Sequence, residues 1–421
     1  MEFEIVSKES IKPSSPTPPE LRHLSPSLFD APIPCHYVEC VFFYHNNESS
    51  AGGRRRSHSE ELKESLSEVL THYYPFAGRL IDGASVECND AGATFTEANL
   101  RCPMSDVTKN DEIWKLLCPG DGTEINPILS VQLTRFQCGG EAICVFLSHK
   151  ISDLVTFATF MNDWASIARN HRGHHELLPV SPQFNASSFF PPGRESCPLV
   201  REQRRDHIVV KRFAFESPKI AALKAMVSEK VENPTRTQLL SALIYKAAVI
   251  STGGLGKQPL PPSSLLQMVN IRKRVVPPLP EALKGNIITF FVVPLQEEVE
   301  LWEVVRDMKR NFEEFCDKYP KNYEAVEWCS LHKLYMEESF GRMAQNFYLC
   351  SSWCNVGLYE VDFGWGKPAW ITMPDIIRRN SIGLMDAKDG EGMEAVVCLD
   401  KEVMAVFEKN QELLSFGCLK S

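Results

Sequence analysis

The sequence lacks the signatures of several large protein classes. No apolar run among its 421 residues approaches the ~18 residues that a membrane-spanning helix needs. Met1–Glu9 contains no basic cluster followed by an apolar stretch, so a secretory signal is not predicted. The serine-nucleophile elbow, the Walker A loop, the dinucleotide fingerprint and His-Glu-x-x-His are also missing. We therefore expect a cytoplasmic protein that makes no membrane contact and binds no dinucleotide cofactor.

Paired cysteines and an excess of positive charge are lacking too. The 14 cysteines are scattered without any Cys-x-x-Cys, which predicts reduced thiols and no metal site. Against 54 acidic residues stand 45 basic ones, giving a net charge of -9. That balance argues against general nucleic-acid binding, which requires a basic surface. It leaves room for a local basic patch that binds an anionic ligand.

Apolar periodicity predicts helices and strands mixed in both halves of the chain. A helix is expected from Ser57 to Thr71, opened by a capping box of Ser57 and Glu60. A β-hairpin is expected around Cys138-Gly139-Gly140, between strands at 128–136 and 142–148. Further helices are predicted at 152–168, 217–227, 235–248, 301–319 and 401–414, and further strands at 84–88, 93–97, 207–215, 265–271, 287–293, 357–361, 381–385 and 393–399.

One segment differs from the rest. Residues 171–206 hold five prolines and few periodic apolar positions, which indicates a crossover between two domains. The sequence thus predicts an α/β fold with mixed sheets flanked by helices. We expect an N-terminal domain at 1–170, the crossover at 171–206 and a C-terminal domain at 207–421.

His149 is the first candidate for chemistry. It follows the apolar run Ile143–Leu147, and a helix is expected to start within a few residues, with Asp153 in its first turn. A histidine on a strand-to-helix turn with an ordinary pKa is largely neutral near pH 7 and can accept a proton. With 11 histidines in the chain, however, His-x-x-x-Asp also arises by chance, and an aspartate at a helix start is good capping chemistry without any catalytic meaning.

The second candidate is Asp362-Phe-Gly-Trp-Gly366. A kinase interpretation fails, because the His-Arg-Asp loop and the glycine-rich loop with its strand lysine are absent. Two glycines around Trp365 instead predict a tight loop held by a buried aromatic ring, which favours a structural role.

Together, and in this order, the two motifs resemble those of the plant BAHD acyltransferase family. The similarity covers essentially the whole chain, and its other landmarks are Tyr74-Pro-Phe-Ala-Gly-Arg79, Cys88-Asn-Asp90, Val269-Asn-Ile-Arg272, Gly285-Asn286 and Ser352-Trp353. The resemblance implies two similar domains like those of chloramphenicol acetyltransferase, joined by the long crossover, in a monomer. It also implies that acyl-CoA and a small-molecule acceptor are the partners, with acetyl-CoA as a co-substrate and no bound cofactor or metal.

The resemblance assigns roles to individual residues. His149 would deprotonate the acceptor in a ternary complex, and Asp153 would brace the turn by pairing with Arg272. Ser351 and Trp353 would line the acyl and substrate pocket, while Asp362, Gly364, Trp365 and Gly366 would be structural. The family usually has glycine where Leu154 stands and often threonine where Ser351 stands, so we expect changed helix packing and a retained hydroxyl.

The N-terminal segment Ile11–Pro18 and the residues of the first motif, His149-Lys-Ile-Ser-Asp153, are most similar to the family's alkaloid and terpenoid O-acetyltransferase branch. The expected reaction is acetyl transfer to a hydroxyl of a polycyclic alkaloid or a triterpenoid such as a limonoid. Leu283–Ile288 lacks the aromatic-Gly-Asn-Cys pattern of flavonoid malonyltransferases, which weakens that substrate class. Three alternatives stay open: N-acylation, a larger acyl-CoA donor, and an inactive homologue that only binds acyl-CoA.

Overall fold

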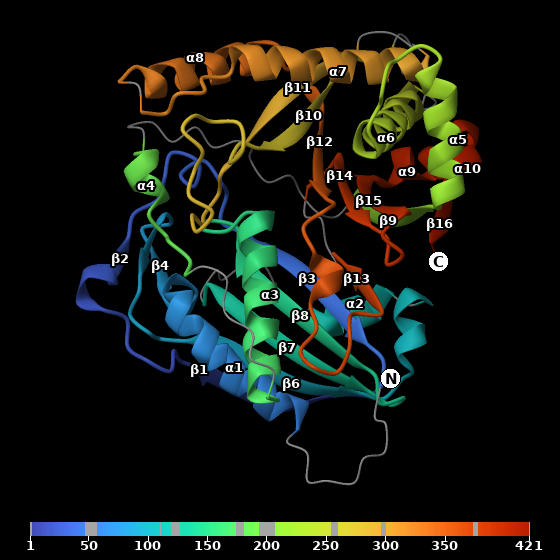
Figure 1. Ribbon diagram of the computed structural model, residues 1–421. Helices are drawn as coiled ribbons and strands as arrows, with labels where there is room; N and C mark the ends of the chain where they lie inside the picture. Colours follow the sequence, from blue (N-terminus) through green and yellow to red (C-terminus); the bar gives the residue numbers. More distant parts are fainter. Residues whose placement is uncertain are drawn as a thin grey trace. The chain divides into compact units, whose positions relative to one another are not determined.

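The chain forms two compact units (Figure 1). The computed structural model describes residues 2–46, 57–109, 111–118, 127–173, 181–192, 207–253, 260–295, 300–324, 326–373 and 378–420. Unit 1 comprises Met1–Val200, Pro280–Ile287 and Val356–Pro374, and unit 2 comprises Arg201–Leu279, Ile288–Asn355 and Asp375–Ser421. The change from unit 1 to unit 2 after Val200 falls in the expected crossover, of which 174–180 and 193–206 lie outside the described residues.

The second half of the chain is therefore not a single unit. Two of its segments return to unit 1, and one of them carries Asp362–Gly366. Our sequence assignment had placed that motif in a C-terminal domain at 207–421. The reason for the return is visible in the backbone pairing, since Trp370–Thr372 adds a strand to the sheet of unit 1.

Unit 1 is built on a six-stranded mixed sheet. Its central β7–β8 hairpin agrees with the expected one, with bounds of Leu129–Phe136 and Glu141–Ser148. Only β6 and β7 pair in parallel. The strand order is β1 (Phe3–Ile11), β6 (Ala93–Leu100), β7, β8, β3 (Tyr37–Tyr44) and β13 (Trp370–Thr372), beside a small sheet of β2 (His23–Leu24), β5 (Ser85–Glu87) and β4 (Arg79–Ile81).

Helices cover both faces of this sheet because side chains alternate along each strand. On β3, Phe42 stacks with Phe157 of α3 (Leu154–His171), whereas Phe43 meets Trp114 of α2 (Asp111–Leu117) edge to face. Next to α3 packs α1 (His58–His72), which opens with the predicted capping box of Ser57 and Glu60. Short helices complete the unit: α4 (Ala186–Phe189), η1 (Pro19–Leu21), η2 (Tyr74–Ala77), η3 (Met104–Lys109) and η5 (Leu358–Glu360).

Unit 2 holds a seven-stranded mixed sheet. The strand order is β11 (Ile288–Leu295), β10 (Ser263–Asn270), β12 (Asn346–Trp353), β14 (Ser381–Asp386), β15 (Met393–Asp400), β9 (Ile208–Phe215) and β16 (Cys418–Lys420). Its helices are α5 (Ser217–Ser228), α6 (Arg236–Gly253), α7 (Leu301–Lys318), α8 (Trp328–Gly341), α9 (Lys401–Phe407) and α10 (Gln411–Phe416). The predicted class, α/β with mixed sheets flanked by helices, is confirmed.

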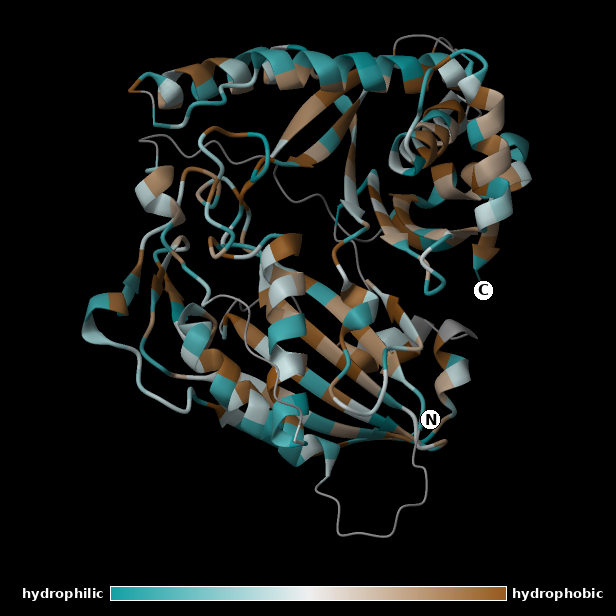
Figure 2. Ribbon diagram, in the orientation of Figure 1, coloured by the Kyte–Doolittle hydropathy of each residue, from teal (hydrophilic) through white to brown (hydrophobic). Residues whose placement is uncertain are grey.

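The helices of unit 2 differ in how much of their surface is buried. Almost every residue of α6 from Leu239 onward is buried, as expected for a helix that is apolar all round. By contrast, α7 is largely hydrophilic in Figure 2. Its buried Leu301, Val304, Val305 and Met308 share one face at helical spacing. Within the described ranges, none of the helices is long and apolar enough to cross a bilayer.

Two predicted elements are wrong. The strand expected at 357–361 is the 3-10 helix η5, because Gly357 adopts φ +72° and turns the chain. The helix expected at 401–414 is split into α9 and α10. The first stretch ends at Phe407, and Asn410 caps the second by accepting a hydrogen bond from Leu413 N at 2.9 Å.

Candidate active site

His149 lies directly after the last residue of β8. Its backbone N donates to His36 O at 2.9 Å, so the residue that precedes β3 fixes its position. The two histidine rings lie 5.0 Å apart, and the His149 side chain is half-buried. The strand-end placement predicted from the apolar run is therefore correct.

The side chain of Asn286 binds His149 at two points. Asn286 Oδ1 lies 3.1 Å from His149 Nδ1, and Asn286 Nδ2 donates to the His149 backbone carbonyl at 2.7 Å. Asn286 is fully buried, with no exposed surface. The histidine is therefore held by a residue 137 positions further along the chain, in the segment Pro280–Ile287 that returns to unit 1.

A buried carboxylate stands behind this amide. Asp30 Oδ1 accepts hydrogen bonds from Asn286 Nδ2 at 2.9 Å and from Asn286 N at 3.1 Å. Its Oδ2 accepts from Ser27 N at 2.8 Å and from Ser27 Oγ at 2.6 Å. Burial raises the pKa of Asp30, and the hydrogen bonds from Ser27 and Asn286 oppose that rise. Four donors on two oxygens are the environment of an ionised carboxylate.

Asp153 caps the helix that follows His149. It is buried, and its Oδ1 accepts from Thr156 N at 2.9 Å as the N-cap of α3. Its Oδ2 accepts from Ile287 N at 3.1 Å. The Thr156 hydroxyl adds a further link, since it donates to Gly285 O and accepts from Gly285 N, both at 3.1 Å. Gly285 adopts φ +120°, a conformation that glycine alone adopts without strain.

The protonation of His149 follows from its surroundings. Burial lowers its pKa, and the contacts with its own backbone carbonyl, Asp153, Asn286 and Asp30 only partly oppose this shift. The neutral imidazole is therefore favoured at pH 7, and it can accept a proton. In the part of the chain that the structure describes, no group of three or more His, Cys, Asp or Glu side chains could hold a metal ion.

The second motif forms one tight loop in unit 1. Asp362 Oδ1 accepts from Gly364 N at 2.7 Å and from Gly366 N at 2.9 Å. Gly364 has φ +100°, and a Cβ there would come within 2.6 Å of Arg172 Cδ. Arg172 Nη1 donates to Gly364 O at 3.0 Å, so the loop is fastened next to the C-terminal end of α3.

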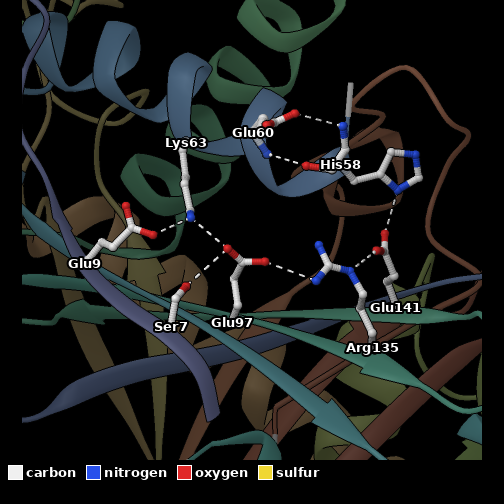
Figure 3. Close-up of polar contacts among 9 residues, drawn as sticks. Ser7, Glu9, His58, Glu60, Lys63, Glu97, Arg135 and Glu141 are labelled. Atoms are coloured by element: carbon white, nitrogen blue, oxygen red, sulfur yellow. Dashed lines mark hydrogen bonds and ion pairs between the residues drawn. The ribbon is translucent and has the colours of Figure 1, made fainter. Parts of the chain in front are cut away.

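Trp365 contacts a histidine and an arginine. The His58 ring stacks on it at 4.1 Å and 17°, and the Arg172 guanidinium carbon lies 5.1 Å from its centroid. His58 in turn contacts Glu141 Oε2 at 2.7 Å. From there a chain of ion pairs crosses the sheet through Arg135, Glu97, Lys63 and Glu9 (Figure 3).

The other predicted site residues belong to unit 2. Ser351 and Trp353 lie on β12, between the parallel strands β10 and β14. Arg272 follows β10, and its backbone N and Nη1 donate to Asn270 Oδ1 at 3.0 and 3.4 Å. The ion pair of Arg272 with Asp153 and the roles of Ser351 and Trp353 stay predictions.

Two residues that contact the motif were not assigned a role from the sequence. In the sequence Asn286 stands out only as part of the Gly285-Asn286 landmark, and no pattern marks Asp30. Neither stands in a spacing that signals chemistry, because they are 256 residues apart. The only signal available was the glycine before Asn286, which indicates a backbone turn that brings the amide to another segment.

Comparisons with known proteins cover nearly the full chain. A model described as the Transferase family matches residues 1–414. The 17,18-epoxy-17-hydroxycur-19-ene N-malonyltransferase of Strychnos nux-vomica is 35% identical, over 99% of this chain and 91% of the relative. Stemmadenine O-acetyltransferase of Catharanthus roseus is 34% identical, over 97% of each chain. The crystal structure of vinorine synthase superposes with a TM-score of 0.85 at 33% identity, covering 99% of this chain and 98% of that one.

Proposed function

The chain belongs to the plant BAHD family of acyl-CoA-dependent acyltransferases, and on that premise we propose that it acetylates a hydroxyl group of a polycyclic plant metabolite. The observation that carries the proposal is His149 itself. Its imidazole is held in place by Asn286, and burial lowers its pKa so that the neutral, proton-accepting form prevails. Acetyl-CoA is consumed as a co-substrate, and the reaction requires no resident cofactor.

The proposed reaction is a direct transfer within a ternary complex. His149 takes the proton of the acceptor hydroxyl while the oxygen attacks the thioester carbonyl carbon. The carbon–sulfur bond then breaks, and His149 returns the proton to the departing coenzyme A thiolate. General acid–base help of this kind contributes about 10²–10⁴-fold. Ser351 and Trp353 are proposed to line the pocket, and Asp153 is proposed to brace His149 without touching the substrate.

The names of the relatives support an acetyl donor and an alcohol acceptor, although not uniformly. One is an O-acetyltransferase that acts on stemmadenine, and another is an N-malonyltransferase. The second makes N-acylation with a larger donor the competing function, since the same base serves either acceptor. A rigid polycyclic acceptor suits a largely apolar pocket with one placed base.

The test is an activity assay on the purified chain. Acetyl-CoA and malonyl-CoA are each offered with a panel of polycyclic alcohols and amines, while thiol release and product mass are recorded. We expect acetyl-CoA with an alcohol to give the fastest turnover. His149→Ala should lose at least about a hundredfold in kcat, whereas His23→Ala, at an exposed position on β2, should keep it.

Wild-type turnover by His149→Ala would rule out the general base. Faster turnover with malonyl-CoA and an amine would replace the proposed function by the competing one. Binding of coenzyme A without turnover on any acceptor would instead support an inactive homologue.

A further inference from the structure

We infer that Asn286 and Asp30 act as positioning residues that hold His149 with its proton on Nδ1, leaving Nε2 as the nitrogen that takes the substrate proton. The inference rests on the proposed function of His149 as the general base. It stands on three buried or half-buried side chains of unit 1 and on the direction of each hydrogen bond between them.

The orientation of the Asn286 amide is fixed by its two acceptors. An amide NH₂ group has two protons, and both are used: one on Asp30 Oδ1 and one on the His149 backbone carbonyl. Rotating the amide by 180° would place its oxygen against these two acceptor oxygens. The amide oxygen therefore faces His149 Nδ1.

The protonation site of the ring then follows. An amide oxygen only accepts, so His149 Nδ1 must donate and must carry the proton. A neutral imidazole has one ring proton, which leaves the lone pair on Nε2. When Nε2 takes the substrate proton, the Nδ1–H bond to Asn286 becomes charge-assisted and therefore stronger.

Asp30 keeps the amide from turning. Its carboxylate contacts Asn286 through both the side chain and the backbone N, and it is anchored by two further donors on Ser27. The backbone carbonyls of Asp30 and Ala31 also accept from Lys150 Nζ at 3.4 and 3.1 Å, next to His149 in the chain. In serine proteases a carboxylate contacts the histidine ring directly. Here the amide of Asn286 lies between the imidazole and the carboxylate of Asp30.

The critical variant is Asp30→Asn. The new NH₂ group must face either Asn286 or Ser27, and both donate to residue 30 through a backbone N–H. Either orientation sets a donor against a donor, so the Asn286 amide loses the anionic acceptor that fixes it and can turn its NH₂ toward His149 Nδ1. Where it does so, Nδ1 must accept, the proton moves to Nε2 and the base is lost. A carboxylate-to-amide change of this kind in the Ser-His-Asp triad lowers kcat about 10⁴-fold through the wrong tautomer.

The experiment combines kinetics with nitrogen NMR on the full-length protein. We expect Asp30→Asn to lower kcat by about 10²–10⁴-fold while KM stays within a factor of about three. Asp163→Asn is the matched control, because Asp163 is also a buried carboxylate but accepts from Tyr73 Oη at 2.6 Å. It should keep wild-type kcat.

The tautomer is read directly from ¹⁵N-labelled histidine, with the His149 signals identified by their loss in His149→Ala. In the wild type at neutral pH we expect the proton on Nδ1, and in Asp30→Asn we expect an increased population with the proton on Nε2. A proton on Nε2 in the wild type, or wild-type kcat in Asp30→Asn, would overturn the positioning role of Asn286 and Asp30. Activity in His149→Ala would reject the proposed function of His149 as general base. Activity in Asp30→Asn alone would reject only the positioning role of Asn286 and Asp30.

Discussion

The carboxylate of Asp153 accepts a hydrogen bond from the backbone N–H of Ile287 at 3.1 Å, across 134 residues of sequence. The residue before Ile287 is Asn286, which holds His149. One short segment therefore fastens both ends of the turn His149–Asp153. Asp153 secures the start of α3, and the amide of Asn286 secures the imidazole.

Removing the brace should destabilise the protein as well as slow it. Asp153→Ala deletes an N-cap, worth ~1 kcal/mol, and strips Ile287 N–H of its acceptor, worth ~1–3 kcal/mol. We expect a loss of about 2–4 kcal/mol in unfolding free energy together with lower activity. Urea unfolding and turnover are measured on the same samples. Unchanged stability with a pure fall in kcat would show that Asp153 acts in the chemistry.

Gly364 should tolerate no side chain. In Gly364→Ala the new Cβ would lie 2.6 Å from Arg172 Cδ on a backbone at φ +100°, so the loop or the arginine must shift. We expect a fall in melting temperature from a strain of about 1–3 kcal/mol. Gly390→Ala isolates the backbone effect, since it has φ +73° with nothing within 4 Å of the added Cβ. Equal melting temperatures for the two variants would contradict the role of the close approach.

Activity should persist to lower pH than an ordinary histidine would allow. Burial lowers the pKa of His149, so its neutral form survives below the usual value near 6.5. The acidic decrease in kcat/KM should therefore have its midpoint below about pH 6.5, because the pH dependence of kcat/KM reports the pKa values of the free enzyme. The measurement is kcat/KM between pH 5 and pH 8 at constant ionic strength. A midpoint above pH 6.5 would mean that the nearby carboxylates raise the pKa of His149 by more than burial lowers it.

The ion pairs of Figure 3 should make the unfolding free energy depend on pH in the acidic range. Burial alone would raise the pKa of Glu97, but hydrogen bonds to Lys63 and Arg135 bring it to about 2. A carboxylate whose pKa is lower in the folded than in the unfolded state stabilises the fold at pH values above its unfolded pKa, here near 4.5. This stabilisation is lost as the pH falls toward 2. Glu97→Gln should lower stability at pH 7 by about 1–2 kcal/mol after allowing for solvent screening.

The difference between wild type and Glu97→Gln should shrink as the pH is lowered from 4.5 to 2. Glu9→Gln is the control, because the Glu9 side chain is 49% exposed and its ion pair with Lys63 is screened. Urea midpoints at several pH values report both. A constant difference across this pH range would exclude the ionised Glu97 as its source.

Local chemistry was predictable, and long-range pairing was not. The capping box at Ser57 and the hairpin at Cys138–Gly140 depend on neighbours in the sequence, and both occur where expected. The polar contact of Asp30 with Asn286 spans 256 residues, and no periodicity encodes such a pair. The unpredicted strands β3 and β12 are part of the same limit, since their partners β13 and β10 come from distant parts of the chain.

The site residues show the same division. The placement of His149 after a strand and of Asp153 at a helix start was predictable, because strand, turn and helix start follow one another within a few residues. The loop of Asp362–Gly366 is tight as expected, but Trp365 is half-buried and not buried as predicted. The contacts of His58 and Arg172 with Trp365 depend on tertiary packing. A residue's neighbours in space, rather than its own type, decide such contacts.

The return of Pro280–Ile287 and Val356–Pro374 to unit 1 has a consequence for biosynthesis. A ribosome delivers the chain from its N-terminus, and domains generally fold as units while synthesis proceeds. The strands β6, β7 and β8 can pair early, but His149 meets Asn286 only after residue 286 has emerged, and β3 gains β13 only after residue 372. His149 therefore lacks Asn286 until the first segment of unit 2, Arg201–Leu279, has been made, and β3 lacks β13 until the second, Ile288–Asn355, has been made as well.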